Sequence, residues 1–323
     1  MRIAAPIEIG PLDADAQQAV RDLAAAAESH DGVAPLSEQP LLNLGTDAEW
    51  ITHVVAHTTA GSTIGYVQVD RSGETASAEL VIHPDHRLGG RGRMLLKTAE
   101  RDATLPSRSG EPGQHGKHLR VWAHGDLEAA RGFARATGLH PVRELLFLAR
   151  PLEQAEVPDL PPAPAGYRLR TFRPGADDDA WLRVNARAFA THPEQGRMTL
   201  DDLRARQAEE WFDPEGFLLA WRGDPDDGGT LLGFHWTKVH PAGDVAAEEV
   251  GEVYVLGVDP DAQGMHLGAA LTDLGLAYLR GRGLGTVMLY VEESNATAVR
   301  LYEARGFTRF SVDVAWHRGT AGT

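Results

Sequence analysis

The stretch from Glu252 to Phe307 decides the fold, because it sets out five elements in a fixed order. They are EVYVLGV (252–258), the turn DPDA (259–262), QGMHLGAALTDLGLAYL (263–279), VMLYVE (287–292) and NATAVRLYEARGF (295–307). We interpret them as a strand, a turn, a loop entering a helix, a second strand and a second helix. A strand that leads through a glycine-containing loop into a helix presents backbone N–H donors and the positive end of the helix dipole to a diphosphate. This order is typical of an acyl-CoA site.

A weaker copy of the same order lies earlier, as ELVIHPDHRLGGRGRMLLKTAE (79–100) and LRVWAHGDLEAARGFARATGL (119–139). Four pairs of loop positions are each separated by 176 residues, namely Pro84 and Pro260, Arg87 and Gln263, Gly90 and His266, and Gly92 and Gly268. We therefore predict two related domains, 1–150 and 167–323. The proline-rich segment 151–166 between them is expected to be a semi-rigid linker.

Composition limits the classes of function. At 323 residues the chain can bury two cores of ordinary size, and its net charge of −15 disfavours nucleic acid and anionic membranes as partners. The chain has no cysteine, so disulfides, thiolate metal sites and a cysteine acyl-enzyme are excluded, and acyl transfer would be direct. No apolar run reaches the roughly 18 residues of a membrane helix, and we expect a cytoplasmic monomer.

Local patterns predict further elements. Thr199 followed by Asp202 resembles a capping box that opens a helix toward Trp211. A helix is predicted over 12–29, where Val20, Leu23 and Ala27 fall at helical spacing. The remaining predictions are strands around 53–59 and 63–69, an exposed loop at 107–116, a strand at 167–172, a helix from Asp177 through Trp181 and Val184, and a strand pair at 217–223 and 231–241.

The loop residues resemble the GNAT superfamily of acyl-CoA N-acyltransferases, whose loop signature is Q/R-x-x-G-x-G/A. Most of both halves is similar to the mycothiol synthase family of tandem GNAT enzymes. The resemblance is carried by DGVAP (31–35) with Glu38, WAHG (122–125), THPEQG (191–196), GFHWTKVHP (233–241), GEVYVLGV (251–258) and SVD (311–313). It implies an α/β (α+β) fold of two GNAT-like domains, each a mixed, mostly antiparallel twisted sheet flanked by helices.

The resemblance also implies a reaction. That family transfers acetyl from acetyl-CoA to the cysteinyl amine of a conjugate of cysteine, glucosamine and inositol, which is the last step of mycothiol biosynthesis. One position departs from the family pattern, because His266 stands where the family and the first half carry glycine. Histidine tolerates the left-handed region better than most residues do, so the loop is still expected to bind CoA.

The resemblance implies a cofactor site in each half. In the second half it comprises Leu256, Gly257, Val258, Gln263, Gly264, Met265, His266, Leu267, Gly268, Ala269, Asn295, Ala298 and Arg300. In the first half it comprises Leu80, Val81, Ile82, Leu88, Gly89, Gly90, Arg91, Gly92 and Arg93. Arg87, Arg91 and Arg93 could contact phosphates there, although exposed arginines at a helix start are an equal alternative. Strict alternation along the motif strand predicts Glu252, Tyr254, Leu256 and Val258 on one face, with Val253 and Val255 on the other.

Two residues are predicted to move protons. A peptide-like α-ammonium has a pKa of about 8, so freeing the amine at pH 7 costs only about 1.4 kcal/mol and a modest base suffices. Glu252 is the candidate base, directly or through water, although an isolated Glu at a strand end is more often merely solvated. Tyr302 occupies the position of the family's acid and would donate to the leaving thiolate, or else simply pack its ring on the sheet.

The first half lacks both groups. At the 176-residue offset Glu252 corresponds to Ala76. The counterpart of Tyr302, which lies seven residues after Asn295, is Phe133, which lies seven residues after Asp126. We therefore predict a catalytically silent first half that keeps an acyl-CoA-like pocket.

Candidate acceptor residues follow from the family by position. They are Glu38, Glu194, Lys238, Glu252 and Tyr290, which suit a ligand with an ammonium and many hydroxyls. Because Glu38 lies in the first half, a site formed from both halves is implied. His192, His235 and His240 show no metal-ligand spacing, so no metal is expected.

Two alternatives stay open. The chain could be a tandem GNAT that acetylates another amine, such as a peptide N-terminus or an aminoglycoside. It could also be a non-catalytic acyl-CoA sensor, which the presence of both Glu252 and Tyr302 disfavours.

Overall fold

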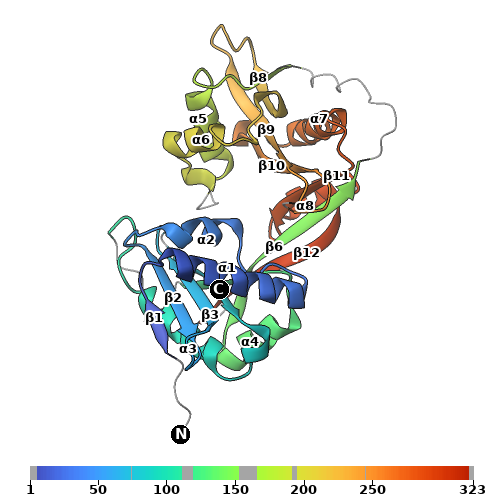
Figure 1. Ribbon diagram of the computed structural model, residues 1–323. Coiled ribbons are helices and arrows are strands. Elements are labelled where there is room, and N and C mark those ends of the chain that lie inside the picture. The colour runs from blue at the N-terminus through green and yellow to red at the C-terminus, as the bar shows by residue number, and fades with distance from the viewer. Residues whose placement is uncertain are drawn as a thin grey trace. The chain divides into compact units, whose positions relative to one another are not determined.

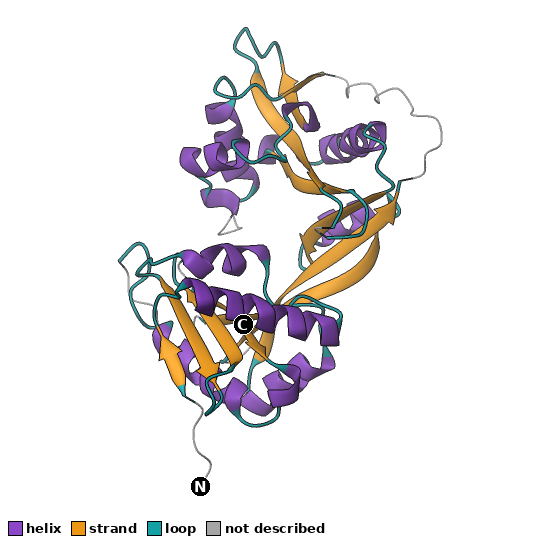
Figure 2. Ribbon diagram, in the orientation of Figure 1, coloured by secondary structure: helices purple, strands orange, loops and turns teal. Residues whose placement is uncertain are grey.

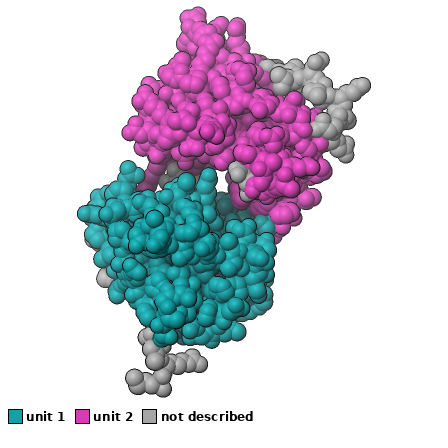
Figure 3. All heavy atoms as spheres, viewed as in Figure 1, with its two compact units in different colours: residues 1–146, 292–294, 311–323 teal, residues 147–291, 295–310 magenta. Residues whose placement is uncertain are grey.

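A computed structural model describes residues 6–73, 75–110, 119–152, 166–190, 195–243 and 245–319. The chain divides into two compact units, coloured separately in Figure 3. Unit 1 contains 1–146, 292–294 and 311–323, and unit 2 contains 147–291 and 295–310. In the described part of the chain no helix is long and apolar enough to cross a membrane.

In unit 1 helices cover both faces of a sheet (Figure 1). Its strands are β1 (Ile7–Ile9), β2 (Ile51–His57), β3 (Thr63–Asp70), β4 (Ser77–Ile82), β5 (Arg120–Ala123) and part of β12 (Thr308–His317), hydrogen-bonded in that order. Its helices are α1 (Ala14–Asp31), α2 (Glu38–Leu42), α3 (Arg91–Asp102) and α4 (Glu128–Thr137). Successive residues of a strand point to opposite faces of the sheet, so unit 1 has a core on each face. Val55 and Tyr66 pack with α1 on one face, and Val54 and Val67 pack with α3 on the other.

Unit 2 has the same layering (Figure 2). Its strands run in the order β6 (His140–Pro151), β11 (Thr286–Glu292), β10 (Val250–Val258), β9 (Thr230–His240), β8 (Phe217–Arg222) and β7 (Tyr167–Thr171). Helices α5 (Asp178–Ala188) and α6 (Leu200–Gln207) lie on one side of β8 to β10, and α7 (Leu267–Gly281) lies on the other. Helix α8 (Ala296–Glu303) packs against α7, because Arg305 just beyond it pairs with Asp273 at 2.6 Å.

Each face of the unit 2 sheet carries its own core. An aromatic cluster on the α5 and α6 side includes Trp181, Phe217, Phe234 and Trp236, with Phe217 and Trp236 stacked at 4.4 Å between ring centroids. On the α7 side Leu256 and Val258 pack with Leu267 and Leu271. We call these the aromatic face and the α7 face of the sheet.

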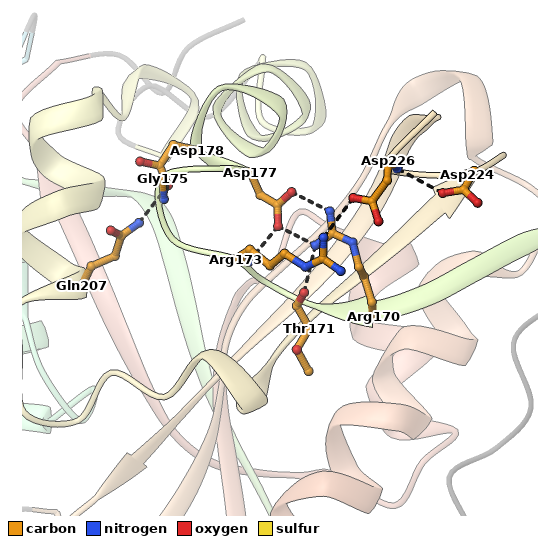
Figure 4. A network of polar contacts seen from close by, with 9 residues as sticks. All are labelled: Arg170, Thr171, Arg173, Gly175, Asp177, Asp178, Gln207, Asp224 and Asp226. Atoms are coloured by element: carbon orange, nitrogen blue, oxygen red, sulfur yellow. Dashed lines mark hydrogen bonds and ion pairs between the residues drawn. The ribbon is translucent and has the colours of Figure 1, made fainter. Parts of the chain in front are cut away.

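Ion pairs fix the start of α5 (Figure 4). Arg170 on β7 holds both oxygens of Asp177, at 2.5 and 2.6 Å, and the Arg173 N–H donates to the same carboxylate at 2.7 Å. Asp178 accepts from the Gly175 N–H at 2.9 Å and from Gln207 at 3.2 Å, which ties α6 to the same turn. These contacts belong to the scaffold of unit 2.

The predicted fold class is confirmed, and the predicted elements occur close to their expected bounds. Val20, Leu23 and Ala27 of α1 are buried, and the Thr199 capping box is present, although α6 ends at Gln207, before Trp211. Most of the proposed linker and residues 111–116 of the predicted loop lie outside the described residues. The domain limits 1–150 and 167–323 stay a prediction. Residues 311–317 of β12 belong to unit 1, where they pair with β5, so the C-terminal strand completes the sheet of the first unit.

Candidate active site

Strand β10 separates from β11 next to Glu252. The parallel ladder comprises the pairs Gly251 with Val287 and Glu252 with Met288, whereas β10 continues to Val258 and β11 to Glu292. No further pair joins these strands among the described residues. Beyond Glu252 their facing main-chain groups can therefore hydrogen-bond an extended amide-containing chain, as pantetheine is.

A bulge at Tyr254 corrects the predicted alternation. Val253 pairs with Thr237 and Val255 with Trp236, so Tyr254 is the extra residue. Tyr254 and Val255 both pack in the aromatic core, whereas Leu256 and Val258 pack beneath α7. The prediction of one shared face for all four even-numbered residues was wrong, because the extra residue shifts the side-chain period by one.

Glu252 lies on the aromatic face. It pairs across the strands with Lys238, and its Oε2 lies 2.7 Å from Nε2 of His240. The residue is 7% exposed and His240 is 8% exposed, so the contact is largely shielded from water. The Lys238 ammonium lies 4.8 Å from the Trp211 ring centroid and 5.7 Å from that of Tyr254, as a cation–π contact on the same face.

Tyr302 belongs to the other face. Its helix α8 packs on α7 through Arg305, which donates to the Ala269 carbonyl at 3.0 Å and pairs with Asp273. The Tyr302 side chain is buried, with its ring edge-on to Phe307 at 5.6 Å. Burial raises the pKa of its phenol, which therefore stays protonated at neutral pH. The two predicted proton-transfer residues, Glu252 and Tyr302, thus belong to opposite faces of the unit 2 sheet.

The loop before α7 has two residues in the left-handed region. Gly264 has φ +77° and His266, the N-cap of α7, has φ +59°. The copy before α3 repeats this shape, with Leu88 at φ +60° and Gly90 at φ +85°. Histidine thus adopts the conformation that the family fills with glycine. The positions 176 residues apart are equivalent in backbone as well as in sequence.

The first turn of α7 fits an anionic group. Leu267, Gly268 and Ala269 form the first turn of α7, and the N–H groups of a first turn have no acceptor within their own helix. No acidic residue occurs in this turn, so nothing opposes the attraction of an anion to the helix dipole. Gln263, Gly264, Met265 and His266 are exposed, and Gly257 is buried against the Phe234 ring. At α8, Asn295 Oδ1 caps the helix by accepting from the Ala298 N–H at 3.1 Å, and Arg300 is exposed.

In unit 1 the predicted pocket residues are partly committed to other contacts. Val81 and Ile82 are buried, Leu80 is half-buried and Leu88 is fully exposed. Arg91 donates to the His86 carbonyl at 3.3 Å, and Arg93 to that of Ala136 at 2.7 Å.

The positions equivalent to the two predicted proton-transfer residues, Glu252 and Tyr302, carry no ionisable group in unit 1. Ala76 is buried, and Phe133 packs in the core, where a Cβ on Gly92 would lie 3.1 Å from its ring. Arg87, a further candidate for phosphate contact, is held by Asp31 at 2.8 and 2.6 Å.

The proposed acceptor residues fall into three groups. Lys238, Glu252 and Tyr290 belong to unit 2, where Tyr290 is exposed and its ring stacks on Phe147 at 5.1 Å. Glu38 is exposed at the first turn of α2 in unit 1. Glu194 lies outside the described residues and stays a prediction. In the described part of the chain no group of three or more His, Cys, Asp or Glu side chains could hold a metal ion.

Sequence reasoning missed the part played by His240. It was considered only as a metal ligand, yet it lies two residues from Lys238 on β9 and so shares a face with Glu252. A strand register between 231–241 and 251–258 would have indicated this contact, because diagonal neighbours on one face of a sheet are within reach of long side chains.

Three of the resemblance motifs meet in unit 1. His124 of WAHG lies between Asp313 of SVD, at 2.9 Å, and Glu79, at 3.4 Å. Ser37, just after DGVAP, donates to Glu79 from its N–H at 2.7 Å and its hydroxyl at 2.6 Å. Burial disfavours a charged His124, but the hydrogen bond that it donates to Asp313 and its ion pair with Glu79 outweigh burial and raise its pKa to about 10. The motifs form a buried charged network that joins β4, β5 and β12.

Comparison with known proteins identifies the family. Residues 181–307 match the Acetyltransferase (GNAT) family. The mycothiol acetyltransferase of Cellulomonas flavigena is 52% identical over 94% of this chain and 86% of its own length, and that of Thermomonospora curvata is 51% identical over 91% of each. The chain belongs to the mycothiol acetyltransferase family. The predicted family and the predicted acetyltransferase class are confirmed.

Solved structures agree with this fold. A GCN5-related N-acetyltransferase from Sphaerobacter thermophilus aligns with a TM-score of 0.71 at 24% identity, covering 96% of this chain and 94% of its own. A tandem GNAT protein from the clavulanic acid biosynthesis pathway aligns with a TM-score of 0.65 at 20% identity, covering 98% and 100%. At these identities the likeness supports the fold alone, so the chemistry of this mycothiol acetyltransferase family member must be argued from its own residues.

Proposed function

We propose that this chain transfers acetyl from acetyl-CoA to the cysteinyl amine of the cysteine, glucosamine and inositol conjugate, the last step of mycothiol biosynthesis. The buried Glu252 carboxylate at the last pair of the β10–β11 ladder carries the proposal. A base there faces the place where the two strands part. The names of the relatives support the acceptor, and the family supports acetyl-CoA as donor.

The proposed chemistry is direct transfer. Glu252 takes a proton from the acceptor ammonium, and the freed amine attacks the thioester carbonyl. The C–S bond breaks as the nitrogen loses its second proton to water and the amide forms. The Tyr302 phenol donates to the departing sulfur, which burial suits by keeping the phenol protonated. The loop from Gln263 to His266 and the first turn of α7 would hold the diphosphate, with pantetheine along β10.

The first unit has no equivalent of this chemistry. Ala76 and Phe133 replace the carboxylate and the phenol, so we infer a silent unit that retains a loop of the same backbone shape. Because residues 311–317 complete its sheet, binding to this unit should be measured in the full chain rather than in residues 1–150. Glu38 and Glu194 stay predictions for the acceptor site.

An amine panel tests the function. The purified full chain is incubated with acetyl-CoA and with the conjugate, a peptide N-terminus or an aminoglycoside, and products are identified by mass spectrometry because the conjugate's own thiol would react with a thiol reagent. We expect one added acetyl group on the cysteinyl nitrogen, with kcat/KM for the conjugate exceeding the others. Faster acetylation of another amine would contradict the proposed acceptor.

The Glu252→Gln variant tests the base. We expect kcat at pH 7 to fall by about 10² to 10⁴, since that is the usual contribution of general-base catalysis. Partial recovery toward pH 9 is expected, because more of the amine is then already neutral. Turnover near the wild-type value at neutral pH would refute the assignment.

A further inference from the structure

A buried histidine contacts the proposed base. His240 ends β9, Glu252 is the third residue of β10, and the 2.7 Å contact joins Nε2 of His240 to Oε2 of Glu252. Both residues are buried. The proposed reaction assigns His240 no role, although a polar contact this short and this shielded fixes the orientation of both groups.

The contact follows from the strand register. His240 pairs with Val250 and Lys238 pairs with Glu252, so His240 is the diagonal neighbour of Glu252 on the aromatic face. Both side chains are carried by paired antiparallel strands rather than by a loop. A paired strand holds its side chains more rigidly than a loop does, and a reacting carboxylate needs such a fixed position.

The contact uses only one carboxylate oxygen. Among the described residues Oε1 of Glu252 has no hydrogen-bond donor, so it is the oxygen left for an ammonium or a water. The nearest cation along β9 is Lys238, whose ammonium lies over the Trp211 and Tyr254 rings instead of pairing with Glu252. Arg206 is engaged with the Tyr254 hydroxyl at 2.9 Å. His240 is thus the partner that the described structure gives to this carboxylate.

We propose that His240 is a positioning residue for the base: it donates from Nε2 to Oε2 of Glu252 and turns Oε1 toward the acceptor amine. This rests on the proposed function of Glu252. In the step itself an N–H bond of the ammonium breaks, its proton goes to Oε1 and the electron pair stays on nitrogen. His240 acts through Glu252 and does not exchange a proton with the substrate.

Two substitutions separate donation from packing. In the full chain, His240→Ala removes the donor, whereas His240→Gln keeps an N–H close to the position of Nε2. A hydrogen bond to a charged group is typically worth about 1.5–3 kcal/mol, which corresponds to about a 10- to 100-fold change in rate. We expect His240→Ala to lose that factor in kcat. His240→Gln should recover most of the rate.

A double-mutant cycle tests whether His240 acts through Glu252. In the Glu252→Gln background, adding His240→Ala should cost less than about 3-fold, because coupled residues are not additive. His140→Gln, at an exposed histidine that begins β6, is the matched control and should behave as wild type. Circular dichroism and thermal melting establish that each variant is folded, and the KM for acetyl-CoA should not change.

The outcomes are distinct. Equal losses from His240→Ala in both backgrounds, or a His240→Gln variant as slow as His240→Ala while folded, would overturn the positioning role. The ratio of each variant's kcat to that of its parent protein is measured with whichever amine the wild type acetylates. The test of His240 therefore does not depend on which acceptor is correct. A wild-type protein that acetylates no amine in the panel would overturn both this inference and the proposed function.

Discussion

The buried network around His124 predicts an alkaline loss of stability. Its folded-state pKa is about 10, above the ordinary histidine value of 6.5, because Asp313 and Glu79 flank it. A raised pKa contributes stability that is complete below pH 6.5 and is lost as pH rises through 10. Each pH unit over which the folded and unfolded states differ by one bound proton is worth about 1.4 kcal/mol, so the 3.5 units between 6.5 and 10 correspond to ~5 kcal/mol.

The assay is urea unfolding at pH 7 and pH 9.5, followed by tryptophan fluorescence, because Trp122 and Trp316 flank the network in paired strands of unit 1. We expect the wild-type free energy of unfolding to fall by ~3 kcal/mol between these pH values. The chain has no cysteine, so no thiol titrates in this window.

The His124→Gln variant isolates the effect, because it keeps every other titrating group. It should be less stable than wild type at pH 7 by ~3 kcal/mol, since the buried Glu79 and the half-buried Asp313 lose their cation, and most of the pH dependence of stability should vanish. The reasoning would be refuted by a wild type that is equally stable at both pH values, or by a variant whose free energy of unfolding depends on pH as strongly as that of the wild type. That result would mean that His124 is neutral in the folded chain.

Four further predictions concern unit 2. Burial lowers the pKa of His235 to about 4, although its ring donates a hydrogen bond to the Leu271 carbonyl. The neutral histidine therefore contributes stability above pH 6.5 that is lost as the pH falls to 4, and the free energy of unfolding measured in urea should drop by ~3 kcal/mol over this range. Gly275→Ala places a Cβ 2.0 Å from the His235 ring, so it should lower Tm and reduce the free energy of unfolding by at least ~2 kcal/mol. Gly281→Ala is the control, because open space surrounds that Cβ, and it should leave stability unchanged or increase it. His266 has φ +59°, which a β-branched residue adopts only with strain, so His266→Val should reduce the free energy of unfolding by ~1–2 kcal/mol in thermal melting. It should also weaken acetyl-CoA binding in calorimetry, whereas His266→Gly should be tolerated. Equal stability and affinity of the two variants would contradict this prediction. Tyr302→Phe should keep the fold and lower kcat at least ~10-fold, and unchanged turnover would remove Tyr302 from the mechanism.

Local sequence patterns predicted much of the fold and the loop. The spacing of Val20, Leu23 and Ala27 fixed the buried side of α1, and the Thr199 capping box marked the start of α6. The 176-residue offset predicted matching loops, and both have their left-handed residues at equivalent positions. These features depend on a few neighbouring residues, whose backbone preferences and periodicity are local properties.

Other features could not be obtained in this way. The Tyr254 bulge inverted the faces of Leu256 and Val258, because one extra residue against a partner strand leaves no trace in the alternation of types. Arg87 seemed a candidate for phosphate contact, yet it is bound by Asp31, 56 residues away. Such contacts depend on which segments pack together.

The sequence by itself determined the order of strands and helices, the repeat, the family and the identity of Glu252 and Tyr302 as candidates. Only the tertiary structure decided which residues surround them: the His240 contact with Glu252, the opposite faces for Glu252 and the Tyr302 helix, and the union of His124 with Asp313 across 189 residues. The physical reason is range. Helix starts, turns and strand periods depend on neighbouring residues, whereas hydrogen bonds and ion pairs between distant strands depend on register, and one residue of slippage replaces every partner.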